Sequence, residues 1–145
     1  MRAQRGFTFV ELLFVVTIVL ILTATAIPGL MGAQRRSRYA KAATDTKTAV
    51  TQAAVYGSDR GAYPTTLGAL RVGGYANVGD FDPWRTAYQL SPPMTAGQQP
   101  GIADDLYVFS QGPSVTGTYP VPFTADTGDD GSVGYSSVYG AWTGR

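Results

Sequence analysis

The sequence predicts an α+β fold in which one long amino-terminal helix packs on a small antiparallel sheet with a long carboxy-terminal loop. Three observations lead to this expectation. Residues 12–34 contain no charged side chain, and residues 39–56 continue in a helical pattern without Gly or Pro. The rest of the 145-residue chain is long enough for one small domain, and it contains short runs typical of strands.

Composition excludes several classes of function. The chain contains neither Cys nor His, which removes the usual ligands of zinc, copper and iron, the commonest general base, and Cys or Ser–His nucleophile arrangements. Its 11 basic and 10 acidic side chains give a net charge of +1, unlike the strongly basic surface of a nucleic-acid-binding protein. We therefore expect neither an enzyme nor a nucleic-acid-binding protein, and no disulfide to stabilise the fold.

The uncharged stretch predicts a membrane-spanning helix. Its 23 residues, Leu12 to Gln34, would form a helix ~35 Å long, and the hydrocarbon core of a bilayer is ~30 Å thick. A secretory signal would instead end its apolar region after about 7–15 residues at a cleavage site of small residues. Because Arg2 and Arg5 precede the span, the positive-inside rule predicts that the carboxy-terminal part crosses the membrane.

Glu11 lies inside this apolar segment, between Val10 and Leu12. A carboxylate in hydrocarbon costs about 2.5–3.5 kcal/mol at a helix centre and less near an end, so a lone one predicts a functional site with a positively charged partner. Removal of the residues up to Gly6 would supply that partner. Phe7 would then carry a free amine, four residues before Glu11 and available to Glu11 of a neighbouring chain.

The run Gly6-Phe7-Thr8-Phe9-Val10-Glu11-Leu12-Leu13, with arginines before it and Pro28 after it, resembles the class III signal of type IV pilins and type II secretion pseudopilins. The resemblance implies that a prepilin peptidase cleaves after Gly6 and methylates the new amino terminus at Phe7. It also implies that Glu11 guides docking of the subunit into a growing filament. A plain single-pass anchor with an incidental Glu11 is the alternative.

Two features mark the end of the span. Pro28 cannot donate to the carbonyl of Ala24, so it should bend or loosen the helix over residues 24–28, although a kink tolerated at the membrane edge explains it equally. In the resembling family, the stretch before this proline can unwind when subunits leave the bilayer and pack in a filament. A basic cluster follows, and it favours contact with lipid headgroups over salt bridges to a neighbouring head. It consists of Arg35, Arg36, Arg38 and Lys41.

Beyond the span, small and apolar residues at spacings of three and four form a stripe on the predicted helix. We expect the head to pack on this stripe and the helix to end at Gly57 in a left-handed cap. Thr65 or Thr66 should then cap a short helix over residues 67–71. The stripe consists of Tyr39, Ala43, Thr46, Val50, Ala53, Ala54 and Gly57.

Two strands are predicted in the head, over residues 86–90 and 106–110, because of alternation in the first run and aromatic and β-branched residues in the second. The segment between them is rich in Pro, Gly and Gln and predicts a loop. Pro83 forces Asp82 into an extended conformation in the turn before the first strand. Trp84 in this turn is expected to rest on the long helix.

Motifs in the head resemble those of the major pseudopilins of type II secretion, in the same order along the chain. The resemblance implies one calcium ion held by Asp129, Asp130 and backbone carbonyls, which suits the preference of calcium for six to eight oxygen ligands. The chain departs from the pattern in having residues 112–114 where an Asp-Gly is usual and in inserting residues 115–125. Asp126 could compensate or be a bystander, and a solvated acidic turn is the alternative. The motifs are Tyr63-Pro64-Thr65-Thr66, Asp82-Pro83-Trp84 with Tyr88, Phe109-Ser110-Gln111-Gly112, Asp129-Asp130 and Trp142.

The resemblance implies a structural subunit of a type IV pilus-like filament, most closely the pseudopilus of type II protein secretion. Residues 1–6 would be a cleaved leader, 7–34 the transmembrane half of the helix, 35–57 its outer half and 58–145 the globular head. The subunit would span the inner membrane with its head in the periplasm before it enters the filament. Its implied partners are further copies of the chain, the prepilin peptidase, the inner-membrane assembly platform and minor pseudopilins.

Two other functions stay open at this point. A type IV pilin used for adhesion, motility or DNA uptake would carry the same amino-terminal signal. A membrane-tethered binding module that never polymerises would use the loops at residues 91–105 and 115–125 for recognition. In that module Glu11 would be dispensable.

Overall fold

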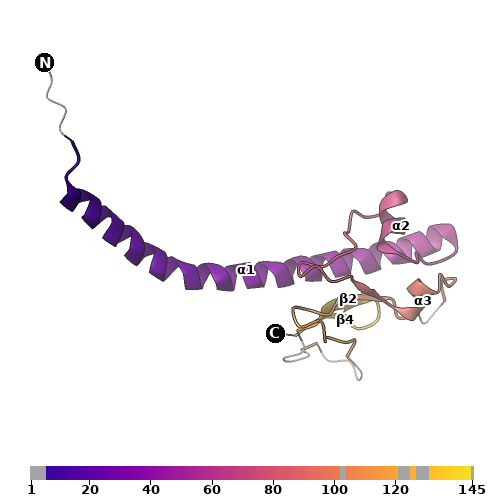
Figure 1. The fold of residues 1–145 in the computed structure, drawn as a ribbon. Coiled ribbons are helices and arrows are strands. Elements are labelled where there is room, and N and C mark those ends of the chain that lie inside the picture. The colour runs from indigo at the N-terminus through magenta and orange to yellow at the C-terminus, as the bar shows by residue number, and fades with distance from the viewer. Residues whose placement is uncertain (1–5, 102–103, 121–124, 127–130, 145) are drawn as a thin grey trace, which may run out of the picture. The chain divides into compact units, whose positions relative to one another are not determined.

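The computed structural model describes residues 6–101, 104–120, 125–126 and 131–144, and it confirms the predicted α+β class (Figure 1). The chain divides into two compact units, residues 1–37 and residues 38–145, which are described separately below. In chain order the elements are helix α1 (Phe9–Arg60), helix α2 (Leu67–Val72), strand β1 (Gln89–Leu90), helix α3 (Pro92–Thr95) and strands β2 (Tyr107–Ser110), β3 (Val133–Ser136) and β4 (Gly140–Thr143).

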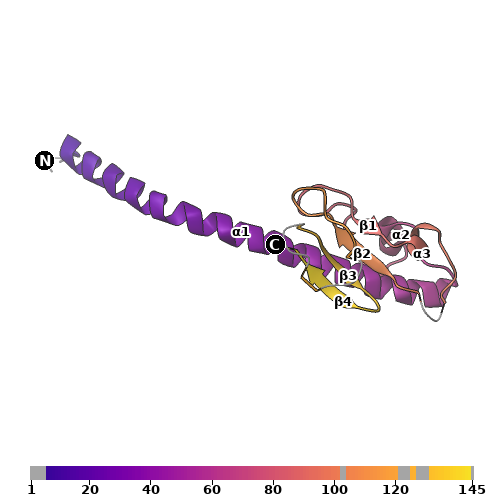
Figure 2. The same ribbon diagram turned by 90° about the horizontal axis from the view of Figure 1, so that it is seen from below.

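The four strands form one antiparallel sheet in the order β1-β2-β3-β4, which lies along the outer half of α1 (Figures 1 and 2). Successive side chains of a strand point to opposite faces. On the face toward α1, Val108 of β2 lies opposite Leu90 and Tyr135, and these residues belong to the hydrophobic core or pack against it. On the other face, the rings of Phe109 and Trp142 lie 6.0 Å apart.

Small side chains on the outer half of α1 let the rest of the head approach the helix closely. Within this stripe, Thr46, Val50 and Ala53 are buried as predicted, but Ala54 is exposed. The prediction for Ala54 was wrong because a helix turns about 100° per residue. The adjacent positions Ala53 and Ala54 therefore cannot both lie at the centre of one narrow face. Ala42 and Ala49, which are fully buried, complete the stripe.

The predicted end of the helix at Gly57 was wrong. The helix continues to Arg60, and the left-handed residue that follows is Gly61, with φ of 72° and an amide that donates to the carbonyl of Gly57 at 2.8 Å. Gly57 is instead buried inside the last turns. A Cβ there would lie 2.6 Å from Cδ1 of the Tyr63 ring, so the position is small because Tyr63 packs on it.

The segment between α1 and the sheet, and the first strand, agree in part with the predictions made from the sequence. Thr66 caps α2, as expected, by accepting a hydrogen bond from the amide of Ala69 at 3.2 Å. The predicted first strand is shortened to β1, because the residues before it are taken up by a turn closed by a bridge between Phe81 and Ala87. The predicted loop after β1 contains the short helix α3.

The turn between Asp82 and Thr86 is built around one buried carboxylate. Oδ1 of Asp82 accepts from the amides of Trp84 at 2.9 Å and Thr86 at 2.8 Å, and Oδ2 accepts from the hydroxyl of Ser110 on β2. The ring of Trp84 meets Tyr39 of α1 edge-on, with centroids 4.8 Å apart. The expected contact of Trp84 with the long helix is confirmed.

We predict that Gly57→Ala lowers the stability of the folded chain. The added methyl group would overlap the Tyr63 ring, which is only 7% exposed and cannot move away freely. Overpacking of this kind costs about 1–3 kcal/mol. Denaturant unfolding of the detergent-solubilised chain measures the change.

Gly68→Ala is the matched control, because a Cβ at that helical position meets its nearest atoms at an ordinary 3.5 Å. This substitution should be neutral or stabilising by up to about 1 kcal/mol. Equal stability of the Gly57→Ala variant and the wild type would show that Tyr63 does not require the glycine.

Candidate functional site

The start of α1 is defined by a reciprocal pair of hydrogen bonds between Thr8 and Glu11. The hydroxyl oxygen of Thr8 accepts from the amide of Glu11 at 3.3 Å, and Oε2 of Glu11 accepts from the amide of Thr8 at 3.0 Å and from its hydroxyl at 2.9 Å. This is a capping box, which satisfies two amides that the first turn of a helix leaves without partners. The helix therefore begins at Phe9, and Gly6, Phe7 and Thr8 lie outside it.

The capping box also orients the carboxylate of Glu11. Its Oε2 takes both bonds from Thr8, whereas Oε1 has no hydrogen-bond partner among the described residues. A carboxylate can accept several further hydrogen bonds, and a negative charge is favoured at a helix amino terminus. Glu11 is thus held on its helix and keeps one oxygen for a cation from outside it.

Thr8 is a residue that the sequence analysis missed. The signal was present as Thr8-x-x-Glu11 immediately before an apolar run, which is the sequence pattern of a capping box. Gly6, Phe7 and Glu11 come together at the start of α1, as the chain order requires. Pro28 lies far along the same helix, which continues through it without interruption.

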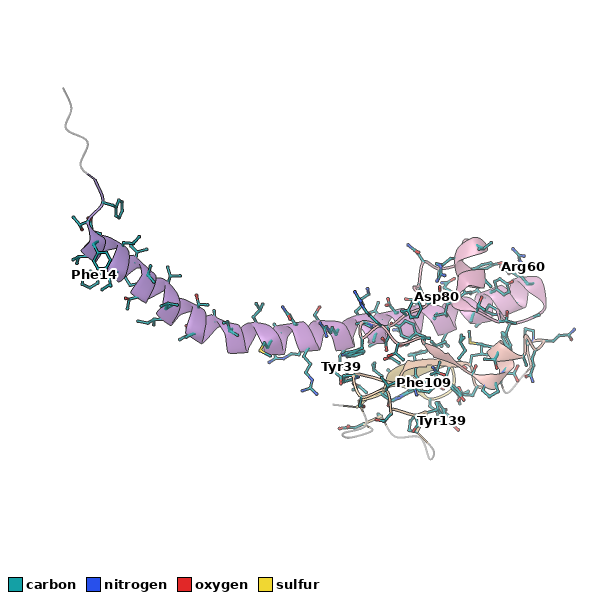
Figure 3. All side chains as sticks on the ribbon, viewed as in Figure 1. Phe14, Tyr39, Arg60, Asp80, Phe109 and Tyr139 are labelled. Carbon is teal, nitrogen blue, oxygen red and sulfur yellow. The ribbon has the colours of Figure 1, made fainter. Side chains whose placement is uncertain are left out.

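The first half of α1 carries exposed apolar side chains that project from the helix on all sides (Figure 3). Among the described residues, α1 is the helix long and apolar enough to cross a membrane. Its polar side chains are satisfied internally, because the hydroxyls of Thr17, Thr23 and Thr25 donate to carbonyls three or four residues earlier. Phe14, for example, is 63% exposed in the isolated subunit.

The turns around Pro28 carry an open apolar groove. Two of its lining positions are small, Ala26 and Gly29, so a side chain of another apolar helix could enter between the larger neighbours. The remaining lining residues are Leu22, Thr23, Ile27 and Leu30. The groove fits a helix surface that packs on other helices.

The predicted calcium ligands lie at the other end of the chain. Asp129 and Asp130 fall outside the described residues, whereas Asp126 is described, exposed and joined by a bridge to Thr143 of β4. The described residues contain no group of three or more carboxylates that could hold a metal ion. The described residues resume at Gly131.

Gly131 and Gly112 form a close backbone contact beside this segment. Both have left-handed φ angles, 72° and 76°, and a Cβ on Gly112 would collide with the carbonyl of Gly131. Residues 112–114, the departure from the expected Asp-Gly, therefore form a tight turn. Only glycine fits at its first position.

Tyr119, in the inserted segment, fastens that segment to the sheet. Its ring stacks on Tyr107 of β2 with centroids 4.0 Å apart and meets Trp142 of β4 edge-on at 5.3 Å. These contacts cover the face of the sheet that α1 does not cover. Tyr119 thus adds a half-buried aromatic ring to that face of the sheet.

The hydroxyl of Tyr119 is bound as well as its ring. It donates to one oxygen of Asp105, whose other oxygen accepts from the hydroxyl of Ser136 on β3. Burial, and next the hydrogen bond to Asp105, raise the pKa of Tyr119 above its usual range. The hydroxyl therefore stays protonated in the folded protein when free tyrosine would ionise.

Residues 1–27 match the family described as the prokaryotic N-terminal methylation motif. The chain is 34% identical to type II secretion system core protein G of Dickeya chrysanthemi over 77% of its own length and 79% of the relative. It is 35% identical to the core protein G of Vibrio cholerae serotype O1 over 67% of its own length and 77% of the relative.

A pilin is also among the relatives. The type IV major pilin protein PilA of Myxococcus xanthus is 30% identical over 94% of this chain and 64% of the pilin. No solved structure gives a significant match.

We predict that Tyr119→Phe destabilises the chain by about 1–2 kcal/mol, because it removes a hydrogen bond to a carboxylate while keeping the ring. The wild type should also lose stability as the pH rises above about 10, where tyrosine in the unfolded chain ionises and Tyr119 in the folded chain does not. That loss should be smaller in Tyr119→Phe. Chemical unfolding between neutral and alkaline pH measures both effects.

Tyr107→Phe serves as the control, since the Tyr107 hydroxyl has no hydrogen-bond partner within the described part of the chain. Its effect should stay within about 0.5 kcal/mol. If the two variants are equally stable, the bond between Tyr119 and Asp105 does not hold the insertion.

Proposed function

The chain belongs to the family of type II secretion system core protein G, and from this premise we propose that it is the repeating subunit of the pseudopilus of such a system. The subunit acts by polymerising and catalyses no reaction itself. The observation that carries this proposal is the environment of Glu11. It is a single carboxylate immediately before the uncharged stretch of α1, residues 12–34, held by Thr8 and left with one oxygen for an external cation.

Processing is the first step of the proposed function. A prepilin peptidase cleaves after Gly6, and the new amino terminus at Phe7 is methylated. The match of residues 1–27 to the methylation motif supports this step. The non-helical conformation of residues 6–8 supports it too, because a peptide bond outside a helix can be held by a protease without unwinding.

Assembly follows from the charges that processing creates. The amine of Phe7 in one subunit binds the carboxylate of Glu11 in a neighbour, which neutralises two charges in an apolar environment where each alone is costly. The apolar surface of α1 then exchanges lipid for neighbouring helices. Pro28 lies in the stretch that loosens during this exchange, and the groove beside it accepts a neighbouring helix.

The location follows from the same features. The subunit waits in the inner membrane as a single-pass protein with its head in the periplasm, because basic residues precede the span and the apolar helix can cross a bilayer. The assembly platform of that membrane and the minor pseudopilins are its proposed partners besides its own copies.

A surface pilus is the second candidate function. The similarity to the type IV major pilin of Myxococcus xanthus over nearly the whole chain favours it. The two functions differ in filament length and place. Long filaments on the surface of cells that express the chain at its natural level would indicate a pilus.

A calcium ion is proposed in the acidic segment before β3. The sequence supports this proposal, because Asp129 and Asp130 would supply carboxylates, to which Asp126 could add a third, and Gly131, with its left-handed backbone, allows the chain to turn sharply there. The ion would bind only the folded head and so stabilise it. It would supplement the fastening of the neighbouring insertion by Tyr119.

We predict that Glu11→Ala abolishes efficient filament formation but not cleavage. Without the carboxylate, the amine of the neighbouring Phe7 has no partner, and a loss of about 1.4 kcal/mol per contact corresponds to a tenfold weaker association. Filament yield in the native host, by shearing and immunoblotting, measures assembly. Mass spectrometry of the same samples should show loss of residues 1–6, with a methyl group on wild-type Phe7.

Thr17→Ala is the matched control, because it removes a polar group from the same helix whose hydroxyl binds only its own backbone. It should assemble like the wild type. An intact leader in assembled wild-type protein would contradict the proposed processing, and normal assembly of Glu11→Ala would contradict the proposed role of Glu11.

For calcium, the chain in detergent should melt at a higher temperature with millimolar calcium than with a chelator. A ligand at 100 times its dissociation constant stabilises the folded form by about 2.7 kcal/mol. Asp129→Ala and Asp130→Ala should remove the difference, while Asp59→Ala, on the last turn of α1, should retain it. Equal melting temperatures of the wild type in the two buffers would leave the acidic segment as a surface turn.

A further inference from the structure

The turn from Phe81 to Ala87, called here the Phe81–Ala87 turn, presents a cation from a strained backbone. Arg85 has φ of 70°, in the left-handed region that favours glycine. Its side chain is exposed, and the guanidinium has no hydrogen-bond or ion-pair partner in the part of the chain that the structure describes. A strained residue whose charge has no partner among the described residues suggests a contact with another molecule.

The turn holds this cation rigidly. The carbonyl of Asp82 accepts from the amide of Arg85 at 3.0 Å, and the amide of Asp82 donates to the carbonyl of Thr86 at 2.8 Å. Together with the bonds of the buried Asp82 carboxylate, these contacts hold the backbone amides of Asp82, Trp84, Arg85 and Thr86. The guanidinium is therefore presented on a backbone that is already ordered.

Aromatic side chains accompany the cation. Phe81 is 65% exposed, and Trp84 packs edge-on against Tyr39, which extends from α1 toward the sheet (Figure 3). Tyr39 follows the last residue of the uncharged stretch, Gln34, by five positions. It therefore lies ~7 Å beyond that residue along a helix, and no more than ~18 Å away in any conformation.

Two further cations lie within two residues of Tyr39 on α1. Arg38 and Lys41 on α1 are exposed, and neither has an ion-pair partner among the residues described. Exposed cations and aromatic side chains close to the end of a span are typical of the membrane interface. There, arginine and lysine bind lipid phosphates, and aromatic rings lie among the headgroups.

We propose that the Phe81–Ala87 turn docks the head of the unassembled subunit on anionic phospholipid headgroups, with Arg85 on a lipid phosphate and Phe81 and Trp84 among the headgroups. This inference rests on the proposed membrane location of the subunit. It adds to the span a second membrane contact, in the folded head.

The aromatic residues favour lipid over the acidic surface of a second copy. A carboxylate of another head would satisfy Arg85, Arg38 and Lys41, but it would give no role to the exposed ring of Phe81. A headgroup layer accommodates both the charges and the ring. Because a cation near an anionic membrane strengthens binding about fivefold, loss of Arg85 should shift the head measurably toward the undocked state.

The chain offers a direct probe, because it contains two tryptophans, one in this turn and one in the sheet. The full-length chain is placed in vesicles that contain phosphatidylglycerol and a lipid with a nitroxide quencher near the headgroup. The difference in quenching between the wild type and Trp84→Phe reports Trp84 without touching Trp142, which is 2% exposed. We expect Trp84 to be quenched and Trp142 not.

Variants of Arg85 separate the effect of its charge on docking from the effect of its backbone conformation on the turn. Arg85→Lys should keep most of the quenching of Trp84. Arg85→Gln should lower the ratio of docked to undocked heads about fivefold and reduce the quenching of Trp84 accordingly. Arg85→Gly, which also relieves the backbone, should lose as much as Arg85→Gln. Vesicles of phosphatidylcholine alone, and wild-type protein in 1 M salt, where the screening length falls to ~3 Å, should lose at least as much, because both also weaken the contacts of the other cations.

Several outcomes would overturn the inference. These are equal quenching of both tryptophans, full quenching in Arg85→Gln, and quenching that appears only at high protein density, which would assign the turn to contacts between copies. Flotation of the chain with vesicles, recorded in the same experiment, tests the span separately. A chain that does not float contradicts the proposed membrane location, whereas a chain that floats without quenching of Trp84 contradicts this inference alone.

Discussion

The rest of the structure depends on the need to cover an apolar, uncharged stretch of helix, residues 12–34, that follows a single carboxylate, Glu11. The apolar side chains of the first half of α1 are exposed in the isolated subunit, and lipid or neighbouring helices would cover them. Glu11 is too costly to leave charged and unpaired in either environment. The capping box with Thr8 satisfies part of its hydrogen-bonding capacity and leaves the rest for a partner outside the helix. The first turn of α1 thus needs a partner from another molecule to complete the hydrogen bonds of Glu11.

The head meets a different constraint, which is to remain folded with a small core and no disulfide. It does so with fully buried small residues on α1, among them Ala49 and Ala53, and with two carboxylates that each join separate segments. Asp82 ties its turn to β2, and Asp105 ties the inserted segment to β3. Hydrogen bonds to charged groups are worth roughly twice those between neutral groups, so two such residues are well suited to hold loops that carry few apolar side chains.

An element could be predicted from the sequence where a local pattern determines it. It could not be predicted where packing against residues distant in the sequence determines it. The span, the Thr66 cap and the strand at β2 follow from local chemistry. Gly57 was taken as a helix end because glycine is common there, but Tyr63, which packs on it, decides its role, and the same pattern occurs four residues later at Gly61. Strands β3 and β4 were not located. Each contains a glycine, which is depleted in strands, and their pairing partners are distant in sequence.

The candidate site shows the same division. Gly6, Phe7 and Glu11 could be recognised because an isolated charge in an apolar run is visible without a structure, whereas Arg85 could not, because its meaning lies in a backbone angle. Glycine would close this turn without strain, and the arginine found there instead supports the proposed role for its charge. The two ends of the apolar span then carry opposite charges that the described subunit does not neutralise. At one end the carboxylate of Glu11 is bound only by Thr8, and at the other end exposed cations have no ion-pair partner among the described residues, so in the proposed function both ends exchange membrane contacts for protein contacts when the subunit joins a filament.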